Sequence, residues 1–207
     1  MSNFVVSIGR QLGSGGKDIA EKLGKILHIP VYDKRLLTEA AAESGLDTTV
    51  FEKADEKESN SFIGNFMALR SSMSEYFSGE DSCMNRDRIF QIQSEVMRDI
   101  ASRESCIIVG RCSEYVLREH PNLISIFITA DIDDRITRTM QKDNLDKEKA
   151  TEYIAKGDKK RKSYHDYYAT TQWGDTKSYD LCLNSSRLGI EGTVEFIHEY
   201  IKRRTAE

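Results

Sequence analysis

The feature that most constrains the fold is a glycine-rich segment at residues 11–18, which stands between a β-rich run and a helical pattern. Residues 4–8 read FVVSI, a short apolar and β-branched run, whereas apolar side chains in residues 19–27 recur at helical spacing. A glycine turn that leads from a strand into a helix exposes backbone N–H groups at the helix N-terminus, where the helix dipole favours an anion. The segment therefore predicts a strand, an anion-binding turn and a helix, in that order.

The turn departs from the regular phosphate-binding pattern G-x-x-x-x-G-K-S/T, and two registers stay open. If Gly16 and Lys17 supply the Gly-Lys pair, Gln11 stands at the first glycine and Asp18 at the Ser/Thr. If the register moves one residue earlier, Gly15 fits the pattern but Gly16 falls on the lysine. A purely structural glycine turn is the alternative interpretation. The candidate cofactor-binding residues of the turn are Gly13, Ser14, Gly15, Gly16, Lys17 and Asp18.

Strand and helix patterns alternate along the rest of the chain. Apolar runs that indicate strands are found at 29–32, 106–109, 123–129 and 179–184. Segments with helical patterns are found at about 34–44, 86–103, 111–119, 132–140, 146–168 and 190–203. Continuously apolar runs are typical of strands that are buried on both faces of a parallel sheet. With 207 residues, the chain suits one α/β domain built on a doubly wound parallel sheet.

Composition excludes several classes of function. The chain has 30 lysines and arginines against 34 aspartates and glutamates, so a general affinity for nucleic acid is disfavoured. No apolar run approaches the roughly 20 residues that cross a bilayer, and the first residues do not resemble a secretory signal. We therefore expect a cytoplasmic protein without nucleic-acid or membrane partners, and a homo-oligomer is compatible with the sequence. The four cysteines form no CxxC pair, and we expect reduced thiols that are buried in the strands at Cys106 and Cys182.

Five segments resemble the cytidylate kinase-like branch of the P-loop nucleoside monophosphate kinases, and the resemblance covers nearly the whole chain. They are SIGRQLGSGGKDIAEKLGKIL, IPVYDKRLL, IIVGRCSEYVL, SIFITADIDDRITRTM and YDLCLNSSRLGIEGTVEFI. The resemblance implies a P-loop-type five-stranded parallel sheet, an ATP site with Mg²⁺ on the glycine turn, and a small-molecule phosphate acceptor. It also implies a helical acceptor-binding insert at about 45–85 and an arginine-bearing lid at about 155–173, within a single domain of residues 1–207.

Three cations are candidate catalytic residues, because phosphoryl transfer depends on positive charge around the moving group. Lys17 lies in the turn, and the alternative is a solvated lysine in the first helical turn. Arg111 directly follows a buried strand, at the edge where α/β proteins bind ligands, and the alternative is surface pairing with Glu114. Arg161 lies in the basic run 159–162, which would otherwise be a solvated face. The resemblance places Arg161 on the lid.

Two further arginines, Arg135 and Arg138, are candidate cofactor-binding residues. They lie one turn apart on the helix that follows the run at 123–129, so both could face the same anion. Pairing with Asp131 or Asp134 of the same helix is the alternative.

Asp33 is the fourth candidate catalytic residue, because it ends the second strand, where a P-loop kinase carries a carboxylate that faces the acceptor. A helix N-cap explains Asp33 equally well. Asp18 could help to retain magnesium in place of the missing Ser/Thr, or could accept hydrogen bonds from free N–H groups, so the metal ligands stay unknown. His165 has no visible partner and is expected to have a surface or stacking role, and no histidine is spaced for zinc.

The leading functional hypothesis is an ATP-dependent phosphotransferase, a kinase of a nucleotide or another small acceptor. The alternatives are a nucleotide-binding regulatory module that has lost phosphoryl transfer, and a helical interaction protein whose glycine turn is structural. Relative to cytidylate kinases, Glu39 stands in place of a phosphate-clamping arginine, and Cys112 stands in place of the aspartate of a GRD triplet. We therefore expect CMP to be a poor acceptor.

Overall fold

The computed structural model describes residues 3–37 and 81–206. The chain divides into two compact units, one formed by Met1–Lys34 with Met97–Glu207 and the other by Arg35–Val96. Within the second unit the described residues are 35–37 and 81–96, and the latter form the first part of a helix. The expected insert at 45–85 lies largely outside the described residues, as do Glu39 and most of the expected helix at 34–44, so these assignments stay predictions.

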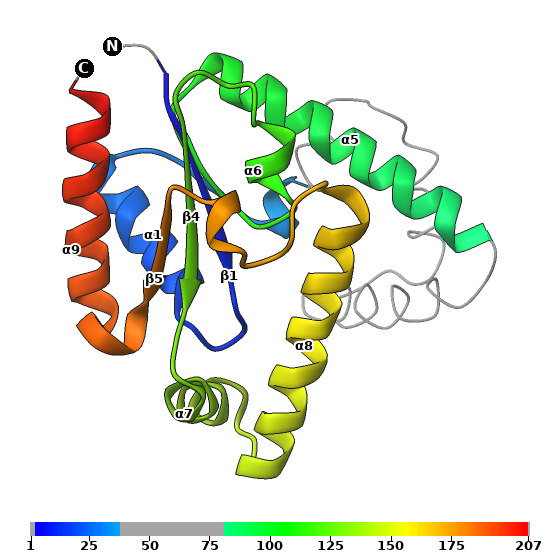
Figure 1. Ribbon diagram of the computed structural model, residues 1–207, viewed down its shortest axis with the longest axis vertical. Helices are drawn as coiled ribbons and strands as arrows, with labels where there is room; N and C mark the ends of the chain where they lie inside the picture. The colour runs from blue at the N-terminus through cyan, green and yellow to red at the C-terminus, as the bar shows by residue number, and fades with distance from the viewer. Residues whose placement is uncertain (1–2, 38–80, 207) are drawn as a thin grey trace, which may run out of the picture. The chain divides into compact units, whose positions relative to one another are not determined.

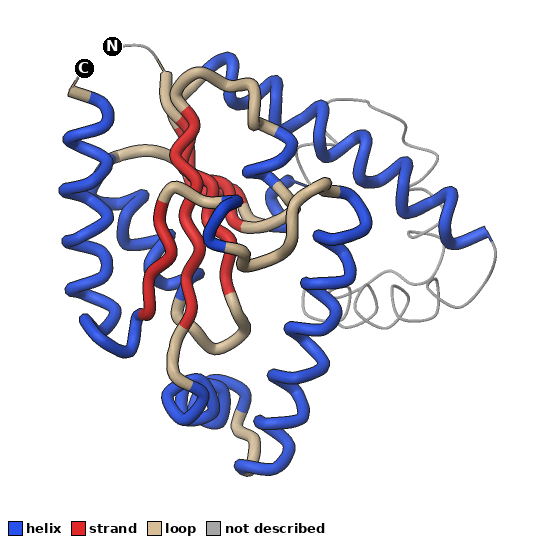
Figure 2. The backbone as a smooth tube through the Cα atoms, viewed as in Figure 1, coloured by secondary structure: helices blue, strands red, loops and turns tan. Residues whose placement is uncertain are grey.

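A five-stranded sheet, parallel throughout, forms the centre of the first unit, as expected (Figures 1 and 2). The order across the sheet is β2-β3-β1-β4-β5, so β1 is central and β2 and β5 are the edges. The chain places β2 and β3 on one side of β1 and then crosses to β4 and β5 on the other side, so the sheet is doubly wound. Ligands of such sheets bind at the carboxyl ends of the strands, near the point where the strand order changes direction. The strands are β1 (Val5–Arg10), β2 (Val31–Tyr32), β3 (Cys106–Val109), β4 (Leu123–Thr129) and β5 (Leu181–Asn184).

Helices cover both faces of this sheet. Helices α1 and α9 lie together on one face, and α6 lies on the other face against β1 and β4 (Figure 1). The helix α7 packs against α8. The helices with described bounds are α1 (Gly16–Leu27), α5 (Asp81–Arg103), α6 (Ser113–Val116), α7 (Ile132–Asp143), α8 (Lys147–Tyr168) and α9 (Ser185–Thr205), and a short 3-10 turn, η1, spans Thr176–Ser178.

Two helices differ from the expected patterns. The helix expected at 111–119 is only four residues long, because Arg111 and Cys112 have positive φ (62° and 56°) and turn the chain before α6 begins. The last helix, α9, has an additional turn before the expected start, and the Asn184 side chain caps this turn by accepting a hydrogen bond from the backbone N–H of Ser186. Gly189, with φ of 66° and ψ of −179°, breaks the helix after this turn, so the continuous helix begins at Ile190 as expected.

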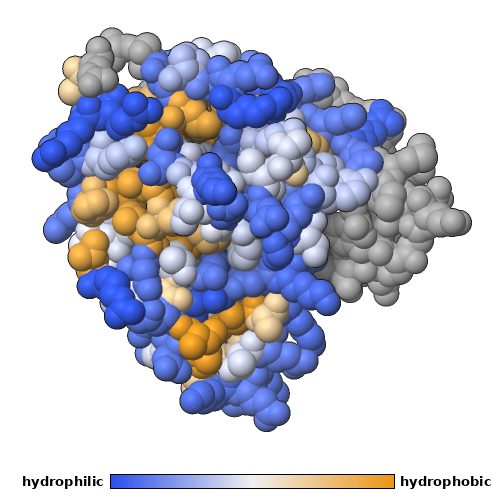
Figure 3. Space-filling model, in the orientation of Figure 1, coloured by the Kyte–Doolittle hydropathy of each residue, from blue (hydrophilic) through white to orange (hydrophobic). Residues whose placement is uncertain are grey.

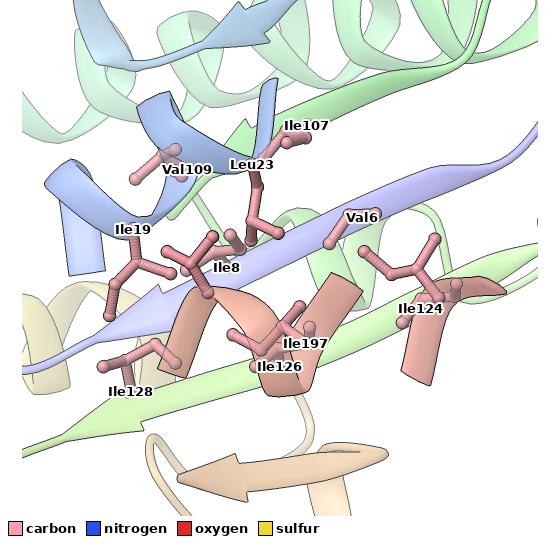
Figure 4. Close-up of a cluster of buried hydrophobic side chains, with 13 residues drawn as sticks. Val6, Ile8, Ile19, Leu23, Ile107, Val109, Ile124, Ile126, Ile128 and Ile197 are labelled. Atoms are coloured by element: carbon pink, nitrogen blue, oxygen red, sulfur yellow. The ribbon is translucent and has the colours of Figure 1, made fainter. Parts of the chain in front are cut away.

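The main core lies between the sheet and the helices α1 and α9. The strands β3 and β4 are apolar along nearly their whole length, and β1 is buried at every residue except Arg10, because both faces of these strands are covered. Ile8 and Ile126 of adjacent strands pack with Ile19, Leu23 and Ile197 of the two helices (Figure 4). All five side chains are fully buried, so truncation of one of these isoleucines to alanine would cost about 2–5 kcal/mol. This core fixes the carboxyl end of β1 relative to the start of α1.

One expectation about the cysteines is wrong. Cys106 and Cys112 are buried free thiols, whereas Cys182 is exposed. Leu181 and Leu183 of the edge strand β5 pack against the main core, and Cys182 alternates with them, so its side chain points to the other face of the sheet. An apolar run on an edge strand resembles a central strand in sequence, although other elements leave one of its faces partly open.

The face of the molecule that Figure 3 shows is mainly hydrophilic outside the grey residues. Figure 3 shows hydrophobic areas over α9 and β5 and at the end formed by α7 and α8. Scattered exposed apolar side chains are normal for globular proteins. Among the helices that the structure describes, none is long and apolar enough to span a membrane. The large exposed apolar side chains in the described ranges are Ile26, Ile132, Tyr153, Tyr167, Leu188 and Phe196.

Candidate functional site

The turn between β1 and α1 lies at the carboxyl end of the central strand (Figure 1). Gly13 and Gly15 both have φ of 77°, in the left-handed region that side chains with a Cβ rarely adopt. A Cβ on Gly13 would lie 2.7 Å from the carbonyl oxygen of Arg135, and a Cβ on Gly15 would overlap Ile190. Gly15 is the N-cap of α1, and no side chain caps this helix. The N–H groups of the first helical turn can therefore be offered to an anion.

The position of Gly15 distinguishes the two registers of the motif. In the regular pattern the second glycine closes the turn and the lysine after it begins the helix. Here Gly15 closes the turn and α1 begins at Gly16. Gly16 therefore stands at the lysine position and Lys17 at the Ser/Thr position. The backbone is that of a phosphate-binding turn, but the position that normally carries the lysine has no side chain.

Side chains from α7, α8 and α9 hold the turn in place. Asp158 of α8 accepts a hydrogen bond of 2.8 Å from the backbone N–H of Leu12, and Nε of Arg135 donates to the Leu12 carbonyl at 2.7 Å. Arg135 also forms an ion pair with Asp158. On the α9 side, the Ser185 hydroxyl donates to the carbonyl of Ser14 at 2.7 Å. The path of the turn is thus fixed by contacts to its backbone rather than by its own side chains.

The two candidate arginines of α7 both reach the turn, rather than the aspartates of their own helix. Arg135 is buried, and its guanidinium is used by the two contacts described above. Nη1 of Arg138 lies 3.1 Å from the hydroxyl oxygen of Ser185 and 3.4 Å from the carbonyl oxygen of Gly13. Arg135 therefore holds the backbone of the turn in place, whereas Arg138 lies beside the turn. A direct contact of either residue with a cofactor stays a prediction.

Lys17 and Asp33 come together beside the turn. Nζ of Lys17 lies 3.0 Å from Oδ2 of Asp33, and the two side chains are 52% and 23% exposed. Nζ also lies 3.8 Å from a carboxylate oxygen of Glu21 on the same helix. The structure thus joins two of the predicted catalytic residues, one from the start of α1 and one from the end of β2, in a pair that solvent can reach.

Three arginines converge at the same edge of the sheet. Arg10 ends β1, Arg111 follows β3, and Arg161 lies on α8. Nη1 of Arg161 donates to the backbone carbonyl of Arg10 at 3.2 Å, and the Arg111 guanidinium carbon lies 5.0 Å from the ring centroid of Tyr164. Burial, followed by the positive charges of Arg161 and Arg111, lowers the pKa of Arg10 to about 9. Within the described ranges, none of the three forms an ion pair with a carboxylate, so the cluster is suited to an anion.

Arg10 and Lys34 are functional candidates that the sequence reasoning missed. Burial, with the positive charges of Arg111 and Lys160, lowers the pKa of Lys34 to about 8. The sequence positions of both residues could have identified them as candidates. Arg10 is the last residue of a strand and stands directly before the glycine turn, and Lys34 directly follows the strand-end Asp33. Strand-end positions of a parallel sheet share one edge, so basic residues there add to the same local field.

His165 is not a surface residue, which corrects the expectation. The His165 ring is buried, with Nε2 2.7 Å from Oε1 of Glu114 and Nδ1 3.3 Å from Oδ1 of Asp166. Burial alone lowers the pKa of His165, but the hydrogen bonds and charges of Glu114 and Asp166 outweigh it, so the net shift is upward. Glu114 is thereby engaged by His165 rather than by Arg111. The partners were invisible in sequence because Glu114 lies 51 residues away.

Magnesium is the metal that a nucleotide site of this kind would use. Among the described residues there is no group of three or more His, Cys, Asp or Glu side chains that could hold a metal by themselves. Magnesium bound with a nucleotide needs only one or two carboxylates in addition to phosphate oxygens and water. The Asp33 carboxylate beside the turn fits this requirement, and Asp18 is exposed in the first turn of α1. Lys17, at the Ser/Thr position, offers no hydroxyl.

Sequence comparison identifies related proteins. Residues 5–187 match the model of the cytidylate kinase-like family. A cytidylate kinase of Staphylothermus marinus is 33% identical over 81 residues, which cover 39% of this chain and 45% of that protein. This chain therefore spans less than half the length of that relative.

Solved structures extend the comparison. An uncharacterized protein from Eubacterium ventriosum is 30% identical, with a TM-score of 0.73 over 97% of this chain and 99% of that chain. The shikimate kinase of Bacteroides thetaiotaomicron is 13% identical, with a TM-score of 0.53 over 96% of this chain and 98% of that chain, and shares the fold. The chain has the α/β fold of the P-loop kinases, and the match over residues 5–187 shows that it belongs to the cytidylate kinase-like family.

Proposed function

We propose that the protein is an ATP-dependent phosphotransferase that acts on a nucleotide or another small anionic acceptor. The observation that carries the proposal is the uncapped N-terminus of α1, with the Lys17–Asp33 pair and the cluster of three arginines at the same edge of the sheet. A triphosphate needs N–H donors, the moving phosphoryl group needs cations, and the acceptor needs a group that orients it. Each requirement has a candidate at this edge.

The triphosphate of ATP would bind in the turn formed by residues 13–17. Two left-handed glycines direct the chain into the helix there, and among the described residues no side chain caps the first N–H groups of α1. Arg138 lies beside the turn and would contribute positive charge. Asp33 is the candidate protein ligand for Mg²⁺, which would neutralise charge on the phosphate oxygens.

The acceptor would bind on the Asp33 side of the turn. The Asp33 carboxylate would accept a hydrogen bond from the acceptor and orient its attacking oxygen. Arg111 and Arg161 would hold the anionic group of the acceptor or the phosphoryl group in transit through charge-assisted hydrogen bonds. The relatives described above support a small acceptor, since one is a cytidylate kinase and another is a shikimate kinase.

A nucleotide-binding regulatory module is the second candidate function. The observation that favours it is the glycine at the lysine position of the turn, because that lysine normally reaches the β- and γ-phosphates. A module of this kind would bind ATP and transfer nothing. Such a regulatory module would also need neither an acceptor nor the Asp33 carboxylate.

Two measurements test the proposal. Thermal unfolding with and without Mg-ATP reports binding, since ligand at about 100 times its Kd adds roughly 2.7 kcal/mol of stability. ADP release is then assayed with nucleoside monophosphates, nucleosides and small hydroxy acids, and repeated with Asp33→Asn. We expect a thermal shift for both proteins and acceptor-dependent turnover for the unmodified protein alone. A shift without turnover on any acceptor would favour the regulatory module, and no shift would exclude both functions.

A further inference from the structure

We infer that Arg10 takes the place of the lysine that the phosphate-binding turn lacks, so that its guanidinium contacts the terminal phosphates of the nucleotide. This inference rests on the proposed function, since it assigns a ligand contact within the proposed ATP site. It concerns a residue outside the turn itself, on the last position of β1.

The path of the Arg10 side chain is the first observation. A Cβ placed on Gly16 would lie 2.7 Å from Cβ and 3.1 Å from Cγ of Arg10, so the stem of Arg10 crosses the first residue of α1. A Cβ placed on Gly110 would overlap Nη1 of Arg10, so the guanidinium lies against the end of β3. Two glycines thus make room for this one side chain. A lysine at position 16 and an arginine at position 10 exclude each other in this arrangement.

The second observation is the exchange of residue types between the two positions. In the register that the structure selects, the pattern G-x-x-x-x-G-K begins at position 10 and ends at position 16. This chain has arginine where the pattern has its first glycine, and glycine where the pattern has its lysine. One positive charge is therefore kept beside the turn, but it is supplied from the strand instead of the helix.

The third observation is that no carboxylate of the described residues forms an ion pair with Arg10. Besides burial, the positive charges of Arg161 and Arg111 lower the pKa of Arg10 more than the carboxylates of Asp33 and Glu114 raise it. Holding a half-buried guanidinium near two others is unfavourable unless an anion offsets the repulsion. A structural arginine would be expected to meet a carboxylate or a row of carbonyl groups. A phosphate group bound in the turn supplies the missing negative charge.

The test begins with Arg10→Met, which keeps an unbranched stem over Gly16 and removes the guanidinium. Arg118→Met is the matched control, because it removes the same charge from an exposed arginine that packs on Tyr115. Binding of Mg-ATP and of inorganic tripolyphosphate is measured by calorimetry on the full chain. We expect Arg10→Met to weaken both ligands about 10- to 100-fold, the usual range for a charge-assisted hydrogen bond. Arg118→Met should change neither by more than about twofold.

A compensating double variant separates a phosphate contact from a structural role. Arg10→Gly with Gly16→Lys restores the G-x-x-x-x-G-K part of the motif and leaves Lys17 at the Ser/Thr position. We expect each single change to lose ATP affinity, because one lacks the cation and the other forces two side chains into one space. The double variant should recover ATP affinity to within about fivefold of the unmodified protein. A structural role of Arg10 would give additive losses instead.

The outcomes also separate this inference from the proposed function. If the unmodified protein binds neither Mg-ATP nor tripolyphosphate, the proposed ATP site fails and the inference fails with it. If the unmodified protein binds both and Arg10→Met binds them within twofold of that affinity, only the inference is overturned. Losses that the double variant does not recover would also overturn it. If Arg10→Met does not fold, Arg10→Lys and the double variant decide, because both keep a cation and should keep ATP binding.

Discussion

Nε2 of His165 lies 2.7 Å from Oε1 of Glu114, and both side chains are buried although they are 51 residues apart in the sequence. The contact joins the last turn of α8 to the short helix α6, which directly follows the strand-end Arg111. Asp166, on the other side of the ring, also accepts a hydrogen bond of 2.9 Å from the backbone N–H of Trp173. The segment expected to act as a lid is therefore anchored toward its carboxyl end by the buried His165–Glu114 contact and by Asp166 beside it.

This network predicts a pH-dependent contribution to stability. The folded state raises the pKa of His165 above its ordinary value of 6.5. A group with a raised folded-state pKa stabilises the fold below its unfolded pKa, and the contribution is lost as the pH rises through the folded pKa. The difference in Tm between the unmodified protein and His165→Gln should therefore be largest near pH 6 and should shrink as the pH is raised above about 6.5. A constant difference between pH 6 and pH 9 would contradict the assignment.

The ion pair between Arg135 and Asp158, which holds the glycine turn, gives a second prediction. Arg135 and Asp158 are 8% and 17% exposed, and both also bind the backbone of Leu12. Breaking a buried pair by removing one partner typically costs about 3–5 kcal/mol, because the other charge stays buried. Asp158→Ala should lower stability by that order in urea unfolding and should also weaken Mg-ATP binding. The control, Asp146→Ala, removes an exposed carboxylate at the start of the same helix and should leave ATP binding unchanged.

Two glycines with positive φ provide a pair of substitutions that differ in the space available for a Cβ. Gly13 has φ of 77° and a Cβ there would lie 2.7 Å from a backbone oxygen, whereas Gly189 has φ of 66° and no described atom within 4 Å of such a Cβ. Gly189 has ψ of −179°, a backbone region that glycine adopts far more readily than other residues, so Gly189→Ala should cost about 1–3 kcal/mol from backbone strain alone. Gly13→Ala should cost more and should abolish binding of Mg-ATP, because the turn must move. Equal losses of stability and unchanged ATP binding would argue against the turn as the phosphate site.

The sequence predicts most of the sheet, because the burial of the strands is visible in their composition. The runs at 106–109 and 123–129 coincide with β3 and β4, since a strand covered on both faces contains almost only apolar residues. The glycine turn was also recognisable, because its backbone requires glycine. The exposed Cys182 could not be separated from a buried strand cysteine, since strand order, rather than local composition, makes β5 an edge.

The candidate site was only partly predictable, because local sequence patterns do not record contacts between distant segments. Lys17 and Asp33 each follow a recognisable element, and the rule that parallel strands end at one edge brings them together. The burial of His165 depends on Glu114 from a distant segment, and no local pattern records such a partner. The role inferred for Arg10 depends on the exact register of the turn, which becomes definite only when Gly15 is seen to cap α1.

Lys17 and Lys22 provide a test of the charge beside the turn. Lys17 pairs with Asp33 near the start of α1, whereas Lys22 lies beyond the first helical turn and pairs with Glu191 at 2.6 Å. Lys17→Ala should weaken Mg-ATP binding about tenfold or more, as expected for loss of a charge-assisted contact. Lys22→Ala should have little effect, because exposed ion pairs contribute about 0–1 kcal/mol. Equal effects of the two substitutions, measured by calorimetry, would remove Lys17 from the nucleotide site.

The identity of the acceptor gives the last prediction. At position 112, where cytidylate kinases carry the aspartate of a GRD triplet, burial raises the pKa of the Cys112 thiol well above its usual range, so the side chain is neutral. Glu39 likewise stands in place of a phosphate-clamping arginine, outside the described residues. Loss of charge-assisted contacts of this kind typically lowers affinity about 10- to 100-fold. We therefore expect CMP to be a poor acceptor, with Arg111 and Arg161 as the cations that remain for another small anionic compound.

An assay of ADP release with Mg-ATP and a panel of nucleoside monophosphates, nucleosides and hydroxy acids checks this prediction. Arg111→Met should raise the KM of the preferred acceptor more than the KM of ATP, because Arg111 lies at the end of β3 rather than in the turn. Arg103→Met, which removes an exposed arginine paired with Asp99, is the control and should change neither KM. Efficient phosphorylation of CMP, with kcat/KM above about 10⁴ M⁻¹s⁻¹, would show that the two altered positions do not discriminate against it.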